Sequence, residues 1–149
     1  MKNLFINFKD TVFQKMITGD IYFISPERRK TKLGDIARIA KNLNPVKFPG
    51  DTVTVYDNSF GDVAYFENEF YSNTHEFVVM SNDVDSYFLY SYLKAIDLES
   101  KMTGHAFKFL KKETLEDVEI VLPSLEEQQK IGKYMKIMDK IVRLRSNGG

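Results

Sequence analysis

The fold is decided by the stretch Val121-Leu-Pro-Ser-Leu-Glu-Glu-Gln-Gln-Lys-Ile131, where a short apolar run meets Pro123 and becomes an amphipathic helix. Ser124 and Glu127 have the spacing of a capping box. In that motif the serine hydroxyl accepts a hydrogen bond from the Glu127 amide, and the glutamate carboxylate accepts one from the Ser124 amide. The sequence therefore predicts a helix that begins here.

Apolar residues recur every three or four positions along this helix and share one of its faces. Two interpretations stay open. The face can cover the chain's own core, or it can form a seam with a partner helix, because the spacing also fits the a and d positions of a short coiled coil. The residues of this face are Ile131, Tyr134, Met135, Met138 and Ile141.

A second one-sided helix is predicted at the other end of the chain, over residues 2–18, with Gly19 as its stop. Its apolar face includes Phe5, Phe8 and Val12. The two terminal helices can bury their stripes against each other or against copies in another chain. We therefore treat both stripes as candidate contacts with a partner or in a homodimer.

Composition predicts one folded domain. The 149 residues are 43% hydrophobic and include twelve Phe and eight Tyr, which is enough for a sizeable core. No apolar run approaches the roughly 18 residues of a membrane span, and the N-terminus lacks a signal-peptide pattern. With no cysteine and two histidines, we expect neither disulfides nor a metal site, and a cytoplasmic location is permitted.

Charge is unevenly distributed although the net charge is zero. Residues 1–47 carry ten Lys or Arg against four Asp or Glu, residues 48–100 one against ten, and residues 101–149 ten against seven. A nucleic-acid footprint would therefore have to come from the two ends of the sequence, because the acidic middle repels phosphate.

The middle of the chain changes to the alternation typical of β-strands. Strands are predicted at 51–56, 63–66, 76–80, 107–110 and 118–122. Before the first of these strands, the sequence predicts a solvated basic connector at 25–32, then one or two helical turns or a turn into a strand at 32–39, and a loop at 42–50. After the strand at 76–80, it predicts a helix that Asp83 or Asp85 caps and that ends at about Leu98. A turn at 101–105 and a short helical turn capped by Thr114 are also predicted.

These elements predict an α+β fold, in which a compact, mixed, β-rich domain is flanked by N- and C-terminal amphipathic, coiled-coil-like helices. The boundaries that we expect are 1–20 for the first helix, 21–123 for the domain and 124–149 for the last helix.

Catalytic signatures are absent from the sequence. It has no GxSxG elbow, no GxxxxGK phosphate loop, no HExxH and no Rossmann glycine fingerprint. His75 and Glu76 are neighbours on a predicted strand, where adjacent side chains face opposite sides and make a poor acid-base pair. We therefore expect that the chain is not an enzyme and holds no cofactor.

Four motifs occur in order along the chain: Lys32-Leu-Gly-Asp-Ile-Ala37, Gly61-Asp-Val-Ala64, Thr103-Gly-His-Ala-Phe-Lys-Phe109 and Ile120-Val-Leu-Pro-Ser-Leu-Glu-Glu-Gln-Gln-Lys-Ile131. The segment Phe8-Lys-Asp-Thr-Val-Phe-Gln-Lys-Met16 looks like the end of a preceding conserved helix. In this order and spacing, the sequence resembles one half of the DNA-specificity (S) subunit of type I restriction-modification enzymes: a single target recognition domain with its flanking conserved helices.

The resemblance implies a module without chemistry of its own. It would read one half of a split site in double-stranded DNA, and its helices would set the distance between half-sites and dock adenine methyltransferase subunits. S-adenosylmethionine and ATP would belong to partner subunits. A full-length S subunit carries two recognition domains and this chain holds one, so it acts as a dimer of halves or is a fragment or remnant.

Candidate DNA contacts follow from side-chain chemistry, since recognition loops share no motif. Amides, hydroxyls and imidazoles in turns can bond base edges, and lysines can hold phosphates. The candidates for bases are Asn58, Ser59, Asn73, Thr74 and His75; those for phosphates are Lys41, Lys47, Lys101, Lys108, Lys111 and Lys112. Ordinary turn chemistry and solubility explain the same residue types. A rival function is a protein-only adaptor or oligomerisation module.

Overall fold

The computed structural model describes residues 4–148, with side chains described from residue 8 to residue 145. The elements are α1 (Leu4–Thr18), β1 (Arg29–Lys32), α2 (Leu33–Ile36), β2 (Arg38–Lys41), β3 (Lys47–Phe48), β4 (Thr52–Tyr56), η1 (Ser59–Gly61), β5 (Val63–Phe66), β6 (Phe70–Tyr71), β7 (Glu76–Met80), α3 (Ser86–Ala95), η2 (Glu99–Lys101), α4 (Lys112–Glu116), β8 (Glu119–Leu122) and α5 (Leu125–Gly148). The expected α+β class is confirmed.

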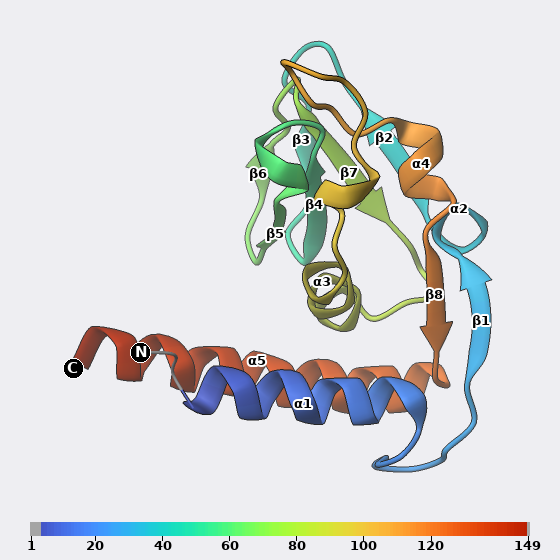
Figure 1. The fold of residues 1–149 in the computed structure, drawn as a ribbon, viewed down its shortest axis with the longest axis vertical. Coiled ribbons are helices and arrows are strands. Elements are labelled where there is room, and N and C mark those ends of the chain that lie inside the picture. Colours follow the sequence, from blue (N-terminus) through green and yellow to red (C-terminus); the bar gives the residue numbers. More distant parts are fainter. Residues whose placement is uncertain (1–3, 149) are drawn as a thin grey trace.

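The terminal helices α1 and α5 lie side by side and antiparallel at one end of the molecule, and the β-rich domain rises from them (Figure 1). Helix α3 lies between this helical base and the four-stranded sheet. The loops after β2 and η2 reach the opposite, distal end of the molecule. The molecule therefore has a helical base and a distal end built from loops.

Within the described residues, the strands form three separate sheets, all with antiparallel pairing. The main sheet has the order β2-β7-β4-β5, with Val53 opposite both Val79 and Tyr65. Strands β1 and β8 form a separate ribbon that joins the base to the domain, and β3 pairs with β6. Strands β4 and β7 are almost entirely buried. The sequence located β4 by its alternation of Thr and Val, and β7 by its short β-prone run between turn residues.

The core is continuous from the sheet through α3 into the helical base. Phe88 of α3 is fully buried and its ring centroid lies 6.1 Å from that of Phe13 of α1. Burying each such side chain contributes about 1.5–3 kcal/mol. Ile131 and Met135 of α5 are 0% and 3% exposed and belong to the same cluster. The base and the domain therefore share one hydrophobic core.

Asp85 caps α3, because its Oδ2 accepts a hydrogen bond from the Phe88 amide at 2.9 Å. Burial raises the pKa of this carboxyl above its ordinary value. Gly132 of α5 allows the close approach of the cap: a β-carbon there would lie 2.1 Å from Asp85 Oδ2. Of the two predicted caps, Asp85 is the residue used.

Several local predictions are corrected. The connector 25–32 is not wholly a solvated loop, since its second half pairs with β8 as β1. The predicted loop at 42–50 contains β3, which pairs with the unpredicted strand β6. Helix α3 ends at Ala95 rather than near Leu98. The predicted strand at 107–110 is only an isolated bridge between Thr103 and Phe109. Helix α4 begins at Lys112, before Thr114, and its N-cap Lys111 makes no side-chain cap bond. Backbone pairing over two or three residues leaves little periodicity to detect.

The residues of the apolar faces predicted on the two terminal helices differ in their burial. Ile131 and Met135 are buried in the chain's own core, so they are corrected from partner contacts to core residues. The other predicted residues keep exposed surface: Val12, Tyr134, Met138 and Ile141 are half-buried, and Phe8 is exposed. The side chain of Phe5 lies outside the described ones. The core interpretation is confirmed for Ile131 and Met135, and the seam interpretation stays a prediction for the residues that keep exposed surface.

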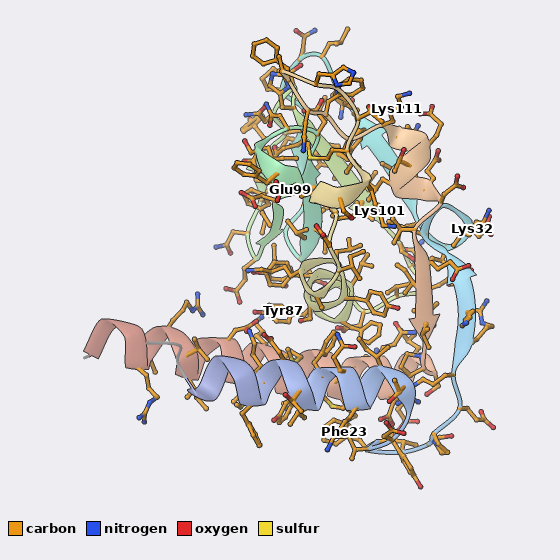
Figure 2. The ribbon with its side chains drawn as sticks, viewed as in Figure 1. Phe23, Lys32, Tyr87, Glu99, Lys101 and Lys111 are labelled. Atoms are coloured by element: carbon orange, nitrogen blue, oxygen red, sulfur yellow. The ribbon has the colours of Figure 1, made fainter. Side chains whose placement is uncertain are left out.

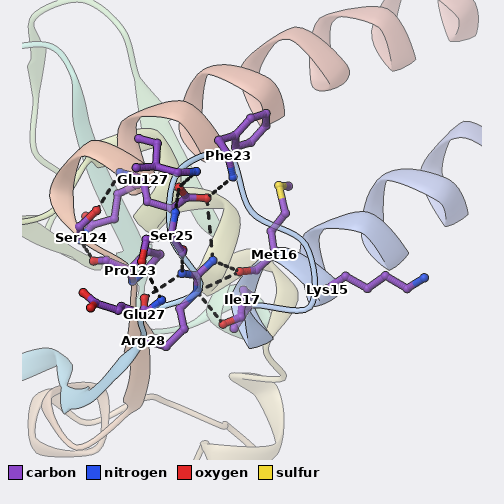
Figure 3. A network of polar contacts seen from close by, with 12 residues as sticks. Lys15, Met16, Ile17, Phe23, Ser25, Glu27, Arg28, Pro123, Ser124 and Glu127 are labelled. Carbon is purple, nitrogen blue, oxygen red and sulfur yellow. Dashed lines mark hydrogen bonds and ion pairs between the residues drawn. The ribbon is translucent and has the colours of Figure 1, made fainter.

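Glu127 and Arg28 form a buried polar clasp, shown in Figure 3. The Glu127 carboxylate accepts hydrogen bonds from the amides of Phe23 and Ile24, both at 2.6 Å, and lies 3.9 Å from the guanidinium of Arg28. Arg28 also donates to the carbonyls of Met16 and Ile17 at the end of α1. Burial lowers the pKa of Arg28, while the Glu127 charge opposes that shift. The clasp joins α1, the 19–28 loop and α5.

The capping-box prediction is therefore half right. The Ser124 hydroxyl accepts from the Glu127 amide at 3.2 Å, as expected. The Glu127 carboxylate instead binds the loop amides rather than the Ser124 amide. Gln128 is also buried: its Oε1 accepts from the Asp85 amide and its Nε2 donates to the Pro123 carbonyl. This motif holds the junction of base and domain together and is not an outer docking surface.

Within residues 4–148, no helix is long and apolar enough to cross a membrane.

Candidate nucleic-acid interface

A cleft of about 610 Å³ opens on the domain between the end of β4, the start of β7 and the loop that follows η2. The residues that line it are Asp57, Asn58, Ser59, Phe60, His75, Glu99, Met102, His105, Ala106, Phe107, Lys108 and Phe109. Three segments that are far apart in sequence thus meet around one space, which is built largely from loops.

Asp57 connects these segments. Its carboxylate accepts from the Lys41 ammonium and lies 3.1 Å from His75 Nδ1. Its backbone amide donates to the His75 carbonyl at 2.8 Å, and its carbonyl accepts from the Leu110 amide at 2.7 Å. The carboxylate is nearly buried, whereas Lys41 and His75 keep 39% and 56% of their side chains exposed. The acidic group is thus turned inward and its basic partners face solvent.

The turn after β4 has unusual backbone geometry. Ser59, Phe60 and Gly61 all have positive φ, at 50°, 65° and 69°. This region is rare for side-chain-bearing residues and costs about 1–3 kcal/mol where it persists. The turn holds the Phe60 side chain 71% exposed at the edge of the cleft. Preceding it, the buried Oδ1 of Asn58 has no hydrogen-bond partner among the described residues.

The opposite wall is a basic loop, residues 101–112, which carries four lysines and one histidine and no acidic residue. Gly104 turns this loop sharply at φ 108°, and a β-carbon there would lie 2.2 Å from the Phe107 carbonyl. Phe107 is 89% exposed, and His105 and Lys108 line the cleft on either side of it in sequence. Positive charge and an exposed aromatic side chain therefore occur together on this wall.

The structure brings together four of the eleven predicted DNA contacts, since Asn58, Ser59, His75 and Lys108 line the cleft. Lys41 does not line the cleft, but its ammonium donates to the carboxylate of Asp57, which does. Asn73 has a local role: its Oδ1 accepts from the His75 amide at 2.8 Å, and its own amide donates to Glu76 Oε1 at the same distance. Asn73 and Thr74, both exposed, belong to the turn that presents His75.

The remaining lysines lie outside the cleft. Lys47 forms an exposed ion pair with Glu69 at 3.3 Å. Lys111 and Lys112 stand exposed at the start of α4, and Lys101 lies on η2 beside a separate hollow that Asp97 and Asp117 also line (Figure 2). The prediction for these four lysines stays a prediction, with positions around the cleft rather than in it.

Sequence reasoning missed the acidic hub Asp57, the two exposed phenylalanines Phe60 and Phe107, and His105. A usable signal existed for Phe107, because an aromatic residue within a run of basic residues without acids is a common nucleic-acid pattern. For Asp57 no signal was available, since its partners Lys41 and His75 are 16 and 18 residues away. Among the described residues, no group of three or more potential ligands could hold a metal ion.

Comparison with known proteins agrees with this arrangement. Residues 7–147 match the family model described as the type I restriction modification DNA specificity domain. The chain belongs to this family. This specificity domain is also 38% identical over 64 residues to a putative type I restriction enzyme MjaX specificity subunit of Methanocaldococcus jannaschii, a match that covers 42% of the chain and 15% of that protein.

Solved structures share the fold of this specificity domain at low sequence identity. The type I restriction-modification S subunit from M. genitalium matches with a TM-score of 0.78 and 15% identity, over 97% of this chain and 50% of that one. The HsdS subunit from Thermoanaerobacter tengcongensis matches with a TM-score of 0.69 and 14% identity, over 95% and 46%. The chain thus spans about half the length of these subunits.

Membership in this family confirms the expected resemblance and assigns the chain to the specificity component of a restriction-modification system rather than to a catalytic one. DNA recognition is the property that names the family.

Proposed function

We propose that the chain reads one half-site of double-stranded DNA through the distal cleft and docks methyltransferase subunits through its helical base. The observation that carries this proposal is the convergence of amide, hydroxyl, imidazole and lysine side chains from three loops around one space on the domain. These are the groups that bond base edges and phosphates.

The charge distribution supports the same assignment. The acidic middle of the sequence turns its central carboxylate, Asp57, inward against Lys41 and His75. The basic loop 101–112 has no acidic residue, and its Lys108 lines the cleft, where Glu99 of η2 is the other carboxylate besides Asp57. Phosphate repulsion by the acidic segment is thereby reduced at the cleft, where a duplex would approach.

The docking surface is proposed on the helical base. Ile21, Tyr22, Phe23 and Ile24 form four consecutive exposed apolar residues, each between 40% and 52% exposed, and Glu127 fixes the amides of two of them. Together with Phe8 and Ile137, they leave apolar surface at the end away from the cleft (Figure 2, in which Phe23 is labelled). Exposed apolar residues gathered in this way typically mark protein contacts.

In this proposal the chain acts in the cytoplasm as a non-catalytic half-subunit. Methyltransferase subunits would bring S-adenosylmethionine, and any motor nuclease subunit would use ATP. A second half-site would be read by another recognition domain, supplied by a second copy of this chain or by further sequence, in keeping with the half-length match to the solved subunits.

Enrichment of duplexes from a randomised pool tests the proposal. The intact chain is used alone and with an adenine methyltransferase subunit of a type I system, at low and moderate salt. We expect one preferred half-site, which weakens in the double variant Asn58→Ala/His75→Ala and persists in Lys133→Ala, an exposed base-end control. Failure to enrich any sequence in either assembly would contradict DNA reading. Methyltransferase binding without enrichment would favour a protein-only adaptor.

A further inference from the structure

Two exposed phenylalanines border the cleft, and the polar contacts described above leave them unused. Phe60 lies on the strained turn after β4, and Phe107 lies on the basic loop opposite. Their exposures of 71% and 89% are among the highest of the large apolar side chains. Because an exposed aromatic ring forgoes the stabilisation of burial, a pair of them at one site calls for a ligand with apolar surface.

The backbone at both positions is built to project these rings. Phe60 adopts φ 65°, a conformation that bulky residues rarely accept. Gly104 permits a turn so tight that a β-carbon would meet the Phe107 carbonyl at 2.2 Å. The strained turn at Phe60 and the tight glycine turn before Phe107 each hold an aromatic ring at the same cleft, which favours a binding role over a packing role.

The surroundings of the rings identify the ligand class. Asn58, His75 and His105 lie in the same cleft, and Lys108 follows Phe107 directly. A protein partner with an apolar surface gains little from such a set, whereas DNA offers phosphates to the lysine, base edges to the amide and imidazoles, and the thymine C5-methyl group to a phenylalanine. The thymine methyl is an apolar group that the major groove presents to a protein.

We infer that Phe60 and Phe107 are specificity-determining residues that contact thymine C5-methyl groups at the half-site. Because this inference rests on the proposed DNA-binding role, it adds an apolar component to recognition: the polar side chains of the cleft select base edges, and the two rings select thymine over cytosine. At such a thymine, removing the C5-methyl group from the DNA and removing the phenylalanine ring from the protein therefore abolish the same methyl–ring contact.

Deoxyuridine provides the test, since it lacks the methyl group and keeps the hydrogen-bonding edge of thymine. The half-site enriched by the intact chain, in whichever assembly binds it, is resynthesised with single thymine-to-deoxyuridine replacements. Affinities are measured for wild type, Phe60→Ala, Phe107→Ala, Phe107→Leu and Tyr71→Ala. Tyr71 is a matched control, 67% exposed and outside the cleft lining. Thermal unfolding establishes that every variant is folded.

At one thymine or more, we expect deoxyuridine to weaken wild-type binding about fourfold, the effect of one buried methyl group. At the thymine whose methyl group a given ring contacts, the same replacement should have no further effect in the alanine variant of that ring, Phe60→Ala or Phe107→Ala. Phe107→Leu should recover part of the affinity that Phe107→Ala loses, and Tyr71→Ala should behave as wild type. Three outcomes would overturn the inference while leaving DNA binding intact. The half-site could contain no thymine, deoxyuridine could have equal effects in wild type and both alanine variants, or the alanine variants could bind as tightly as wild type. A wild-type chain that enriches nothing would instead remove the proposed function itself.

Discussion

The two ends of the molecule use polar residues in opposite ways. At the helical base, Glu127 and Arg28 are buried, and their charges are paired with each other and with backbone groups. At the cleft, Lys41 and His75 keep 39% and 56% of their side chains exposed to solvent. Polar groups that are satisfied internally hold a fold together, whereas polar groups held open are available to a ligand.

The difference also separates motif from function. The most recognisable stretch of the sequence, around Pro123 and Glu127, builds the junction between base and domain. The cleft combines one of the family motifs, Thr103–Phe109, with turns that no motif marks. The stretch that is easiest to recognise therefore supports the fold, and the proposed DNA-reading site lies elsewhere in the molecule.

Glu127→Ala should sharpen this contrast most. It removes the acceptor of two loop amides and leaves the Arg28 charge without its buried partner, so we expect a loss of about 3 kcal/mol in the free energy of unfolding. Urea denaturation measures the loss. The matched control is Glu126→Ala, whose exposed side chain should change stability by less than about 0.5 kcal/mol. Equal effects of the two substitutions would contradict a structural role for the clasp.

Gly132→Ala tests the same junction from the side of α5. The new β-carbon would lie 2.1 Å from Asp85 Oδ2 and 3.2 Å from the Phe88 amide nitrogen, so the α3 cap must shift. Alanine is the better helix former, yet overpacking here should destabilise the protein by about 1–3 kcal/mol. Lys133→Ala on the exposed face is the control. A stabilised Gly132→Ala variant would show that α3 and α5 pack less tightly than described.

Asp85→Asn addresses the pH dependence of stability. Burial raises the pKa of Asp85 in the folded state above its unfolded value, so ionisation costs more when folded. Wild type therefore loses stability as pH rises through the interval between the two pKa values and regains it as pH falls toward about 4. Asparagine retains a capping oxygen without the charge.

We expect Asp85→Asn to be more stable than wild type at pH 7, with the difference shrinking on acidification. Chemical denaturation at several pH values measures it, and Asp83→Asn, which is exposed, is the control. A difference that grows on acidification would contradict the buried, cap-forming position of Asp85.

Lys108→Ala should have the smallest effect, confined to DNA binding. Loss of one phosphate contact lowers affinity similarly for all sequences and reduces the salt dependence of binding by about one counterion. Titrations of the enriched and a scrambled duplex at several salt concentrations measure both quantities. Lys133→Ala removes the same charge from the helical base and should leave the salt dependence unchanged. A change in sequence preference would instead place Lys108 at a base edge.

The sequence predicted elements better than contacts. Strands 63–66 and 76–80 and the cap Asp85 were found because short β-prone runs between turn residues and capping residues are local signals. The partner of Glu127 was missed because it lies about 100 residues away, in a loop whose amides carry no side-chain signature. Likewise, Ile131 and Met135 have the spacing of a seam, and only the position of α3 shows that they belong to the core.

Four of the candidate DNA contacts, Asn58, Ser59, His75 and Lys108, line one cleft, and their binding to bases or phosphates stays a prediction. The turn geometry that exposes Phe60 depends on three consecutive positive φ angles, which a Ser-Phe-Gly sequence does not specify. Strain of this kind is maintained by tertiary packing and leaves no pattern in the chain.

The most direct test of the account is the specificity ratio of Asn58→Ala/His75→Ala. This ratio is the affinity for the enriched duplex divided by the affinity for a scrambled one, measured beside the free energy of unfolding. The account predicts a ratio at least about tenfold below that of wild type, as expected for lost base contacts, in a protein of nearly unchanged stability. A folded double variant with the wild-type ratio would contradict the claim that the distal cleft reads DNA.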